Sequence, residues 1–133
     1  MIDAESTIFD RVADAFDEAY PNGSRYGEET TSPPRFPCLT LVQVDNFTYE
    51  PSLDAANKEH NAWLVFEANV YSNKTAGAKQ ECKDIMQLVD EQMQSLNFVR
   101  LFCTPSKNAD KKYFRMTARY RAVISEEYRL YRT

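Results

Sequence analysis

The residues of this chain with the most obvious catalytic potential are its single histidine and its cysteines. His60 lies in a polar stretch, Lys58 to Asn61, and no serine or cysteine near it has the flanking pattern of an activated nucleophile. Acyl-transfer or hydrolytic chemistry needs such a nucleophile beside its base. We therefore expect a solvated histidine at a strand edge, a protein that is not an enzyme, and no bound cofactor.

A metal centre would need several histidine, cysteine or carboxylate ligands at short spacing. Cys38, Cys82 and Cys103 are far apart and each is flanked by apolar residues, which predicts buried free thiols and neither a metal site nor a disulfide framework. A run of carboxylates near the N-terminus is typical of a solvated helix face: Asp10, Asp14, Asp17 and Glu18.

Aromatic and arginine side chains follow a different pattern, because they recur at every second position of two segments. The segment Ala62 to Tyr71 places apolar residues on one side and the following on the other: Trp63, Val65, Glu67, Asn69 and Tyr71. The segment Lys112 to Ile124 does the same with Tyr113, Arg115, Thr117, Arg119 and Arg121. Trp, Tyr and Arg are the residues most enriched at binding hot spots. The sequence therefore predicts an assembly surface whose contact residues are Trp63, Tyr71, Arg115, Arg119 and Arg121.

Two other interpretations of this surface stay open. An antiparallel sheet can be wet on one side, with arginine stems lying over aromatic rings. The same residues can also stack bases and pair with phosphates, as in a small nucleic-acid-binding β-sheet module. The acidic balance of the chain argues against nucleic acid, and the aromatic signature of an RNA recognition motif is absent.

Periodicity predicts two amphipathic helices and four strands in the order α-β-β-α-β-β. The helices span about Ala4 to Tyr20 and Thr75 to Leu96, and the strands are Cys38 to Val44, Ala62 to Tyr71, Phe98 to Thr104 and Lys112 to Ile124. Each helix has a single apolar stripe, so we expect an α+β fold in which both helices cover one face of a four-stranded, mostly antiparallel sheet. The opposite face is then left uncovered.

Residues at the ends of these elements, and in the connections between them, also allow predictions. Ser72, Asn73 or Thr75 can cap the second helix, and Asn97 suits the left-handed position after it. Two long polar connections, Ser24 to Pro37 and Asn46 to Asn61, are expected to order on contact with a partner. The tail Ser125 to Thr133 is polar, with Tyr128, Leu130 and Tyr131 available to pack.

The length and the charge of the chain limit the classes of protein to which it can belong. The 133 residues suit one domain, residues 1–133. The beginning of the chain lacks the features of a secretion signal and no apolar run could span a membrane, so we expect a cytosolic protein. Residues 1–99 carry net charge −10 and residues 100–133 carry +6. This segregation predicts complementary contacts between parts of the molecule or between copies.

Several stretches resemble the tail terminator, or tail completion, proteins of long-tailed bacteriophages. They are Pro37 to Val42, Trp63 to Asn73 continuing into Lys79 to Ile85, Leu88 to Glu91 through Leu96 to Phe98, and Tyr113 to Tyr120. The α-β-β-α-β-β order is also similar to that family. One departure is Asn97, where a glycine is common; asparagine tolerates the same backbone region.

The resemblance implies a structural virion protein that assembles as a hexameric ring on the completed tail tube. Such a ring stops further tube polymerisation and offers a surface to the head-side connector. The implied partners are further copies of the chain, the tail tube protein and the head-side connector protein, with no membrane and no specific nucleic acid. The implied location is the tail or neck of the virion, and the host cytoplasm before assembly. Another phage neck or head-tail connector protein is the alternative.

Overall fold

The structure is a computed structural model that describes residues 1–28, 33–49, 60–106 and 112–132. Its described part has an α+β fold, as the sequence predicts. The elements in chain order are α1 (Glu5–Ala19), β1 (Ser24–Tyr26), β2 (Cys38–Thr48), β3 (Asn61–Ser72), α2 (Ala78–Ser95), β4 (Val99–Ser106), β5 (Phe114–Ser125) and β6 (Leu130–Tyr131).

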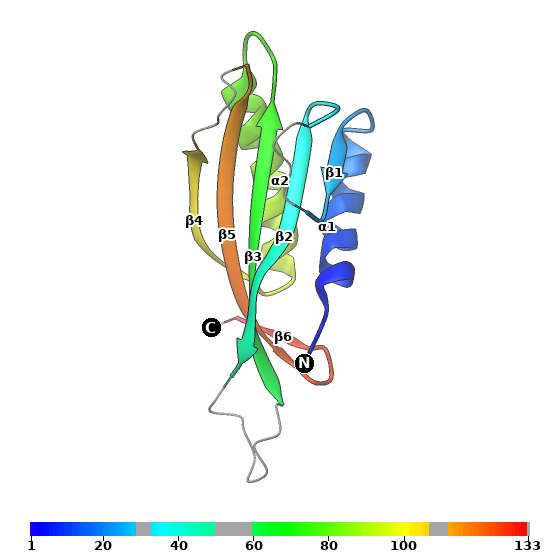
Figure 1. The fold of residues 1–133 in the computed structure, drawn as a ribbon, viewed down its shortest axis with the longest axis vertical. Coiled ribbons are helices and arrows are strands. Elements are labelled where there is room, and N and C mark those ends of the chain that lie inside the picture. The colour runs from blue at the N-terminus through cyan, green and yellow to red at the C-terminus, as the bar shows by residue number, and fades with distance from the viewer. Residues whose placement is uncertain (29–32, 50–59, 107–111, 133) are drawn as a thin grey trace.

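All strands belong to one sheet, in the order β1-β2-β3-β5-β4 (Figure 1). The β2, β3, β5 and β4 pairings are antiparallel, and β1 pairs with β2 in parallel. Strand β6 pairs with the end of β5, at Val123 and Ile124. Because β3 occupies one edge of β5 along its whole length, β6 continues the line of β4 on the other edge. The prediction of four strands is therefore wrong in number: two short strands extend the sheet and β1 makes it mixed.

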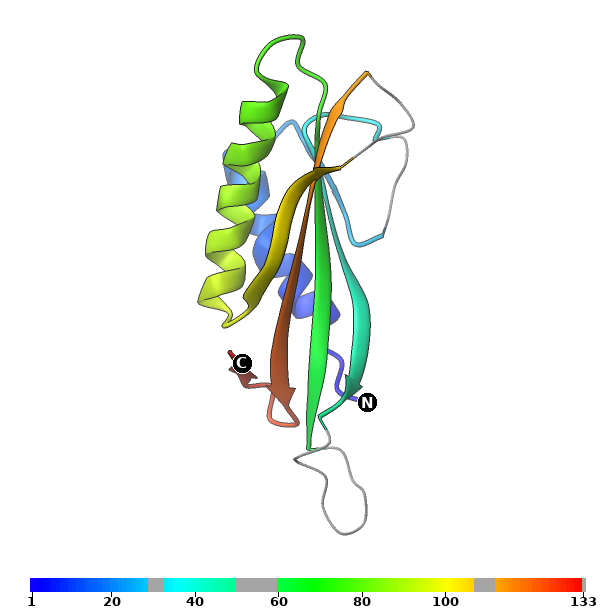
Figure 2. The same ribbon diagram turned by 90° about the vertical axis from the view of Figure 1, so that its left-hand side faces the viewer.

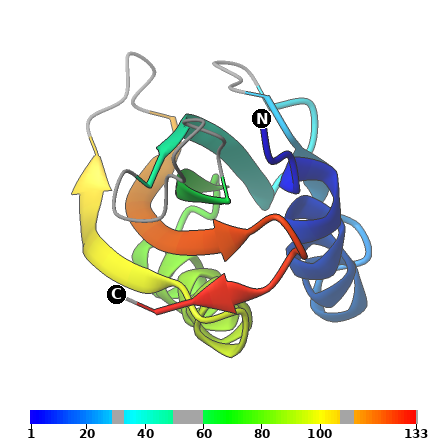
Figure 3. The ribbon, with the colours of Figure 1, turned by 90° about the horizontal axis from the view of Figure 1, so that it is seen from below.

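Both helices lie on the same side of the sheet (Figure 2). Helix α1 buries Ile8, Val12 and Phe16, and α2 buries a stripe from Cys82 to Met93. The opposing sheet residues are the alternating apolar positions of β3 and β5, which are fully or almost fully buried: Leu64, Phe66, Ala68, Val70, Met116, Ala118, Tyr120, Ala122 and Ile124. Seen along the strands, the sheet bends around the two helices (Figure 3). The predicted alternation is confirmed, and it leaves one face of the sheet without helices.

Helix α2 begins later than predicted and ends as predicted. Its first residue, Ala78, follows Gly77, whose φ of 86° lies in the left-handed region, and no side chain caps this end. The caps expected from Ser72, Asn73 or Thr75 are therefore wrong. At the other end Asn97 has a φ of 66°, and the amide of Phe98 donates to the Met93 carbonyl at 2.9 Å. This is the 6→1 bond of a Schellman motif, so the left-handed role of Asn97 is confirmed.

The long connections are shorter than predicted. Strand β1 occupies part of Ser24 to Pro37, and β2 runs on to Thr48 instead of ending at Val44. Residues 29–32 and 50–59 of these connections, and residues 107–110 of the polar turn after β4, lie outside the described residues. Among the helices that are described, none is both long and apolar enough to cross a membrane.

Candidate assembly surface

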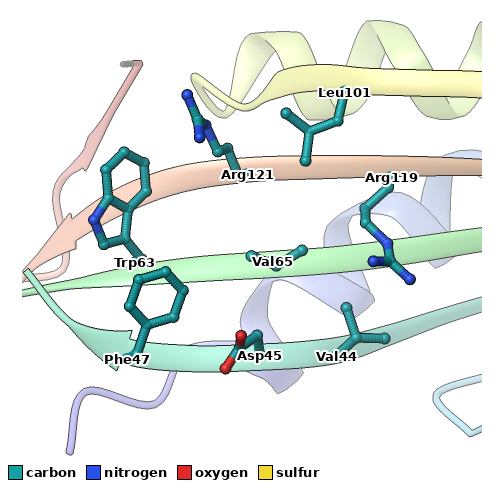
Figure 4. Close-up of a pocket in the computed structure, with 8 residues that line it drawn as sticks. All are labelled: Val44, Asp45, Phe47, Trp63, Val65, Leu101, Arg119 and Arg121. Carbon is teal, nitrogen blue, oxygen red and sulfur yellow. The ribbon is translucent and has the colours of Figure 1, made fainter.

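The side of the sheet away from α1 and α2, called the open face below, carries all five predicted contact residues. In the β3–β5 register, Val65 faces Arg121, Glu67 faces Arg119 and Tyr71 faces Arg115. Trp63 lies on the same side as Val65, two residues along β3. Facing residues and alternate residues share one side of a sheet. Figure 4 shows Trp63, Arg119 and Arg121 together on this side.

The end of the open face near Tyr71 is covered by the chain itself. Tyr71 is only 1% exposed, its ring meets that of Tyr113 edge to face at 5.6 Å, and the ring of Phe36 lies 5.4 Å from Tyr113. The Arg115 guanidinium lies 5.5 Å from the Tyr71 ring centre, and its Nε donates to Asn69 Oδ1 at 3.0 Å. Tyr71 and Arg115 are therefore part of an internal cluster in this structure and lie apart from the other three predicted residues.

The other end of the open face is a hollow of about 580 Å³ (Figure 4). Its floor is β3, its sides are β2, β5 and β4, and its lining residues are Val44, Asp45, Phe47, Trp63, Val65, Leu101, Arg119 and Arg121. Val44 is 41% exposed, Phe47 47%, Leu101 45% and the neighbouring Phe102 39%. We call these four residues the exposed apolar group. Exposed apolar side chains gathered in one place are typical of an interaction surface.

The two arginines of the hollow have different partners. Arg121 lies 4.9 Å from the centre of the Trp63 ring and forms no ion pair with a described residue. Arg119 Nη2 lies 3.4 Å from Glu67 Oε1, and its guanidinium is 5.8 Å from the Phe102 ring centre. Its Nε is buried and has no hydrogen-bond partner among the described residues. A buried donor left unpaired costs free energy, so Arg119 has capacity for a further hydrogen-bond partner. Arg121 has capacity for a carboxylate partner.

Two β-bulges position the apolar sides of the hollow. The β2–β3 register shifts between Gln43 and Asp45, and the β4–β5 register shifts between Arg100 and Phe102. Each shift inserts one extra residue, Val44 in β2 and Leu101 in β4, and a bulged residue can be re-aimed out of the ladder. Sequence reasoning missed both, because the alternation of β2 and β4 is too irregular to assign their residues to a side.

Trp63 sits at the end of the hollow in an aromatic group. The Phe47 ring is nearly parallel to it at 6.2 Å, and the Tyr49 ring meets it edge to face at 5.6 Å. Phe47 and Tyr49 belong to a segment that the sequence predicts as loop, so their role was also missed. The signal that could have found them is the spacing Asp45, Phe47, Tyr49, which continues the two-residue period past the bulge.

The residues with catalytic potential lie elsewhere. His60 Nδ1 is 3.1 Å from Glu126 Oε1, and no group of three histidine, cysteine or carboxylate residues capable of holding a metal is found among the described residues. Cys38 and Cys82 are buried as predicted, whereas Cys103 is half-buried. Burial raises the pKa of all three thiols, and that of Cys82 to about 12. Thiols with raised pKa values are poor nucleophiles at neutral pH.

Comparison with family models and with curated proteins gave no match to this chain.

Proposed function

We propose that this chain is a structural virion protein that forms a ring on the end of a phage tail tube. The ring ends tube polymerisation and provides the head-tail joining surface. The observation that carries the proposal is the open face, where the exposed apolar group, Trp63 and two arginines gather on the side of the sheet that has no helices. The resemblance of the sequence to tail terminators supplies the assembly to which such a face would belong.

Charge supports a ring of identical subunits. Closing a ring requires a head-to-tail contact, in which two different patches of each subunit meet. Helix α1 carries three exposed carboxylates, Asp10, Asp14 and Glu18, that form no ion pair with a described residue. They recur every four residues and point away from the buried stripe of the helix. The arginines lie on the other side of the sheet, so an acidic and a basic patch are available on different sides of one subunit.

In this proposal the partners are further copies of the chain in a hexamer, the tail tube protein and the head-side connector. The open face contacts the tube or the next subunit. No catalytic step is part of the proposal. A role without catalysis is supported by the contact of His60 with Glu126 and by the raised pKa values of the thiols. A role as another neck or connector protein would use the same face with different partners.

A nucleic-acid-binding role has less support from the geometry. A base stacks on an accessible aromatic face, whereas the Trp63 ring already has Arg121 over it and Phe47 beside it. If the face did bind nucleic acid, the affinity would fall steeply with added salt.

The test is the variant Arg119→Glu in a tube-capping assay. Reversing this charge places an introduced carboxylate in the hollow, beside Glu67 on the neighbouring strand. We therefore expect binding to tubes to weaken at least tenfold and tubes to grow past their normal length. Tube lengths can be measured by electron microscopy. The matched control is Lys83→Glu, an equal charge change on the exposed side of α2, which should cap normally. An Arg119→Glu protein that forms rings and caps tubes like the wild type would contradict the proposal.

A further inference from the structure

The exposed apolar group determines which kind of surface can cover the hollow. Seven large hydrophobic side chains are exposed among the described residues, and four of them are Val44, Phe47, Leu101 and Phe102. They flank Trp63 and Val65, which are only half-buried. Removing this apolar surface from water is favourable only if the covering surface is itself apolar.

The rim of the hollow adds one charge of each sign that has no ion-pair partner among the described residues. Asp45 on β2 and Arg121 on β5 lie on opposite sides of the floor strand β3 (Figure 4). Among the described residues, the Asp45 carboxylate accepts a hydrogen bond only from the amide of Asn46, at 2.9 Å, and it forms no ion pair. Arg121 contacts the Trp63 ring and, within the described chain, no carboxylate. The hollow is therefore apolar in the middle, with an anion on one side and a cation on the other, neither of which is paired within the described part of the chain.

Such a pattern is self-complementary under a two-fold rotation. A two-fold axis that lies between the two copies, parallel to β3 and above Val65, would place apolar residues on apolar residues, and would bring Asp45 of each copy against Arg121 of the other. Two sheets can pack face to face in this way with their side chains interdigitating. The acidic stripe of α1 can complement the arginines of the hollow, but it offers no apolar surface to cover the exposed apolar group.

We propose that the free protein forms a two-fold dimer in which the hollow of one copy covers the hollow of the second. The dimer hides the exposed apolar group until another partner replaces the second copy. This inference goes beyond the ring on the tail tube, since it concerns the protein before assembly and needs no tail component.

The test uses two single charge reversals, Asp45→Arg and Arg121→Glu. Each alone creates two like-charge contacts across the two-fold axis, so we expect each variant to dimerise at least tenfold more weakly than the wild type. An equimolar mixture of the two should restore the dimer, because both contacts in the mixed pair again join opposite charges. Light scattering over a concentration series measures the mass, which should rise from the 15.4 kDa of one chain to twice that value for the wild type and for the mixture.

The control Lys83→Glu changes the charge equally on α2 and should dimerise like the wild type, and circular dichroism checks that every variant is folded. A wild-type protein that stays monomeric at all concentrations would overturn the inference. So would a mixture that fails to dimerise, or one that forms particles larger than two chains. A monomeric protein that still caps tubes would overturn the dimer and leave the ring proposal standing.

Discussion

Asp90 of α2 holds together three elements through its two carboxylate oxygens. The residue is 6% exposed. Its Oδ1 accepts hydrogen bonds from the Tyr120 hydroxyl at 2.9 Å and from Arg100 Nη1 at 3.1 Å, and Oδ2 accepts one from Gln94 at 2.6 Å. Burial and the nearby Asp90 charge raise the pKa of Tyr120, so its hydroxyl remains a donor at neutral pH. The sequence indicates a polar surface position for Asp90, because nothing local reveals that α2 is packed against β4 and β5.

Asp90→Asn should destabilise the protein by about 1–3 kcal/mol. The amide that replaces one oxygen cannot accept a hydrogen bond, and the ion pair with the half-exposed Arg100 is lost. The matched control is Glu91→Gln, at an exposed position of the same helix, which should change the free energy of unfolding by less than about 0.5 kcal/mol. Urea denaturation measures both, and equal effects would show that Asp90 is not a structural link.

The buried thiol of Cys82 should make the folded protein less stable at alkaline pH. Burial, with a contribution from Glu81, raises the pKa of its thiol from 9.0 to about 12 in the folded state. Between these values the unfolded chain releases the proton and the folded chain retains it, so stability falls as pH rises, by up to about 1.4 kcal/mol per pH unit.

The measurement is the free energy of unfolding between pH 8 and 11 for the wild type, Cys82→Ala and Cys103→Ala. The Cys82→Ala protein should show a clearly shallower alkaline slope, whatever its stability at pH 8. Cys103 is half-buried, so its replacement should change the slope less. Identical slopes for the wild type and Cys82→Ala would refute this origin of the pH dependence.

At the scale of elements, the connection from α1 to β1 depends on a close approach at Gly23. A Cβ atom at this position would lie 2.7 Å from the Pro37 carbonyl oxygen and 2.9 Å from the Phe16 ring. Both neighbours are fixed, since the Pro37 carbonyl accepts the Ser24 amide at 3.0 Å and Phe16 is fully buried. Only glycine lets the chain pass between α1 and the start of β2.

Gly23→Ala should therefore cost about 1–3 kcal/mol of stability through overpacking. Gly27→Ala is the natural comparison, because the nearest atoms to its Cβ would be those of the Phe9 ring at 3.8 Å, an ordinary contact. That variant should lie within about 0.5 kcal/mol of the wild type. Thermal or chemical denaturation of the two variants measures their stability. A Gly23→Ala protein as stable as the wild type would mean that the chain is packed less tightly at this connection.

The elements that sequence could predict are those with a sustained period. The stripes of α1 and α2 and the alternation of β3 and β5 each extend over ten residues or more, so their type and their buried side were predictable. Strand β1 has three residues and β6 two, which is too short for any period. Their pairing depends on contacts with β2 and β5 that local sequence does not encode.

The residues of the candidate site that lie on β3 and β5 were predictable from sequence, and those on β2 and β4 were not. Alternation along β3 and β5 placed Trp63, Arg119 and Arg121 on one side, and the structure gathers them in the hollow. Val44 and Leu101 were missed because a bulge reverses the alternation at each of them. Tyr71 lies on the predicted side but is buried, since a distant segment brings Phe36 against Tyr113 and Tyr113 against Tyr71.

For the whole molecule, the separation of layers determines which surfaces are available. The helices cover one face of the sheet and their own outer side is acidic at α1, while the open face carries arginine and the exposed apolar group. The carboxylates of α1 and the arginines of β5 thus lie on two sides of the folded subunit, whereas Arg100 pairs with Asp90 on the helix side. Association through such patches should be fast and sensitive to ionic strength, while its strength comes from the apolar contact.

The most direct measurement of the central proposal, that the open face binds other chains, is hydroxyl-radical footprinting of the protein when dilute and when bound to tail tubes. We predict that oxidation of Trp63, Phe47 and Phe102 falls several-fold on binding. Tyr128, which is 60% exposed and lies outside the hollow, should keep its rate and serves as the internal control. Unchanged oxidation of Trp63, Phe47 and Phe102 in a tube-bound protein would contradict the account.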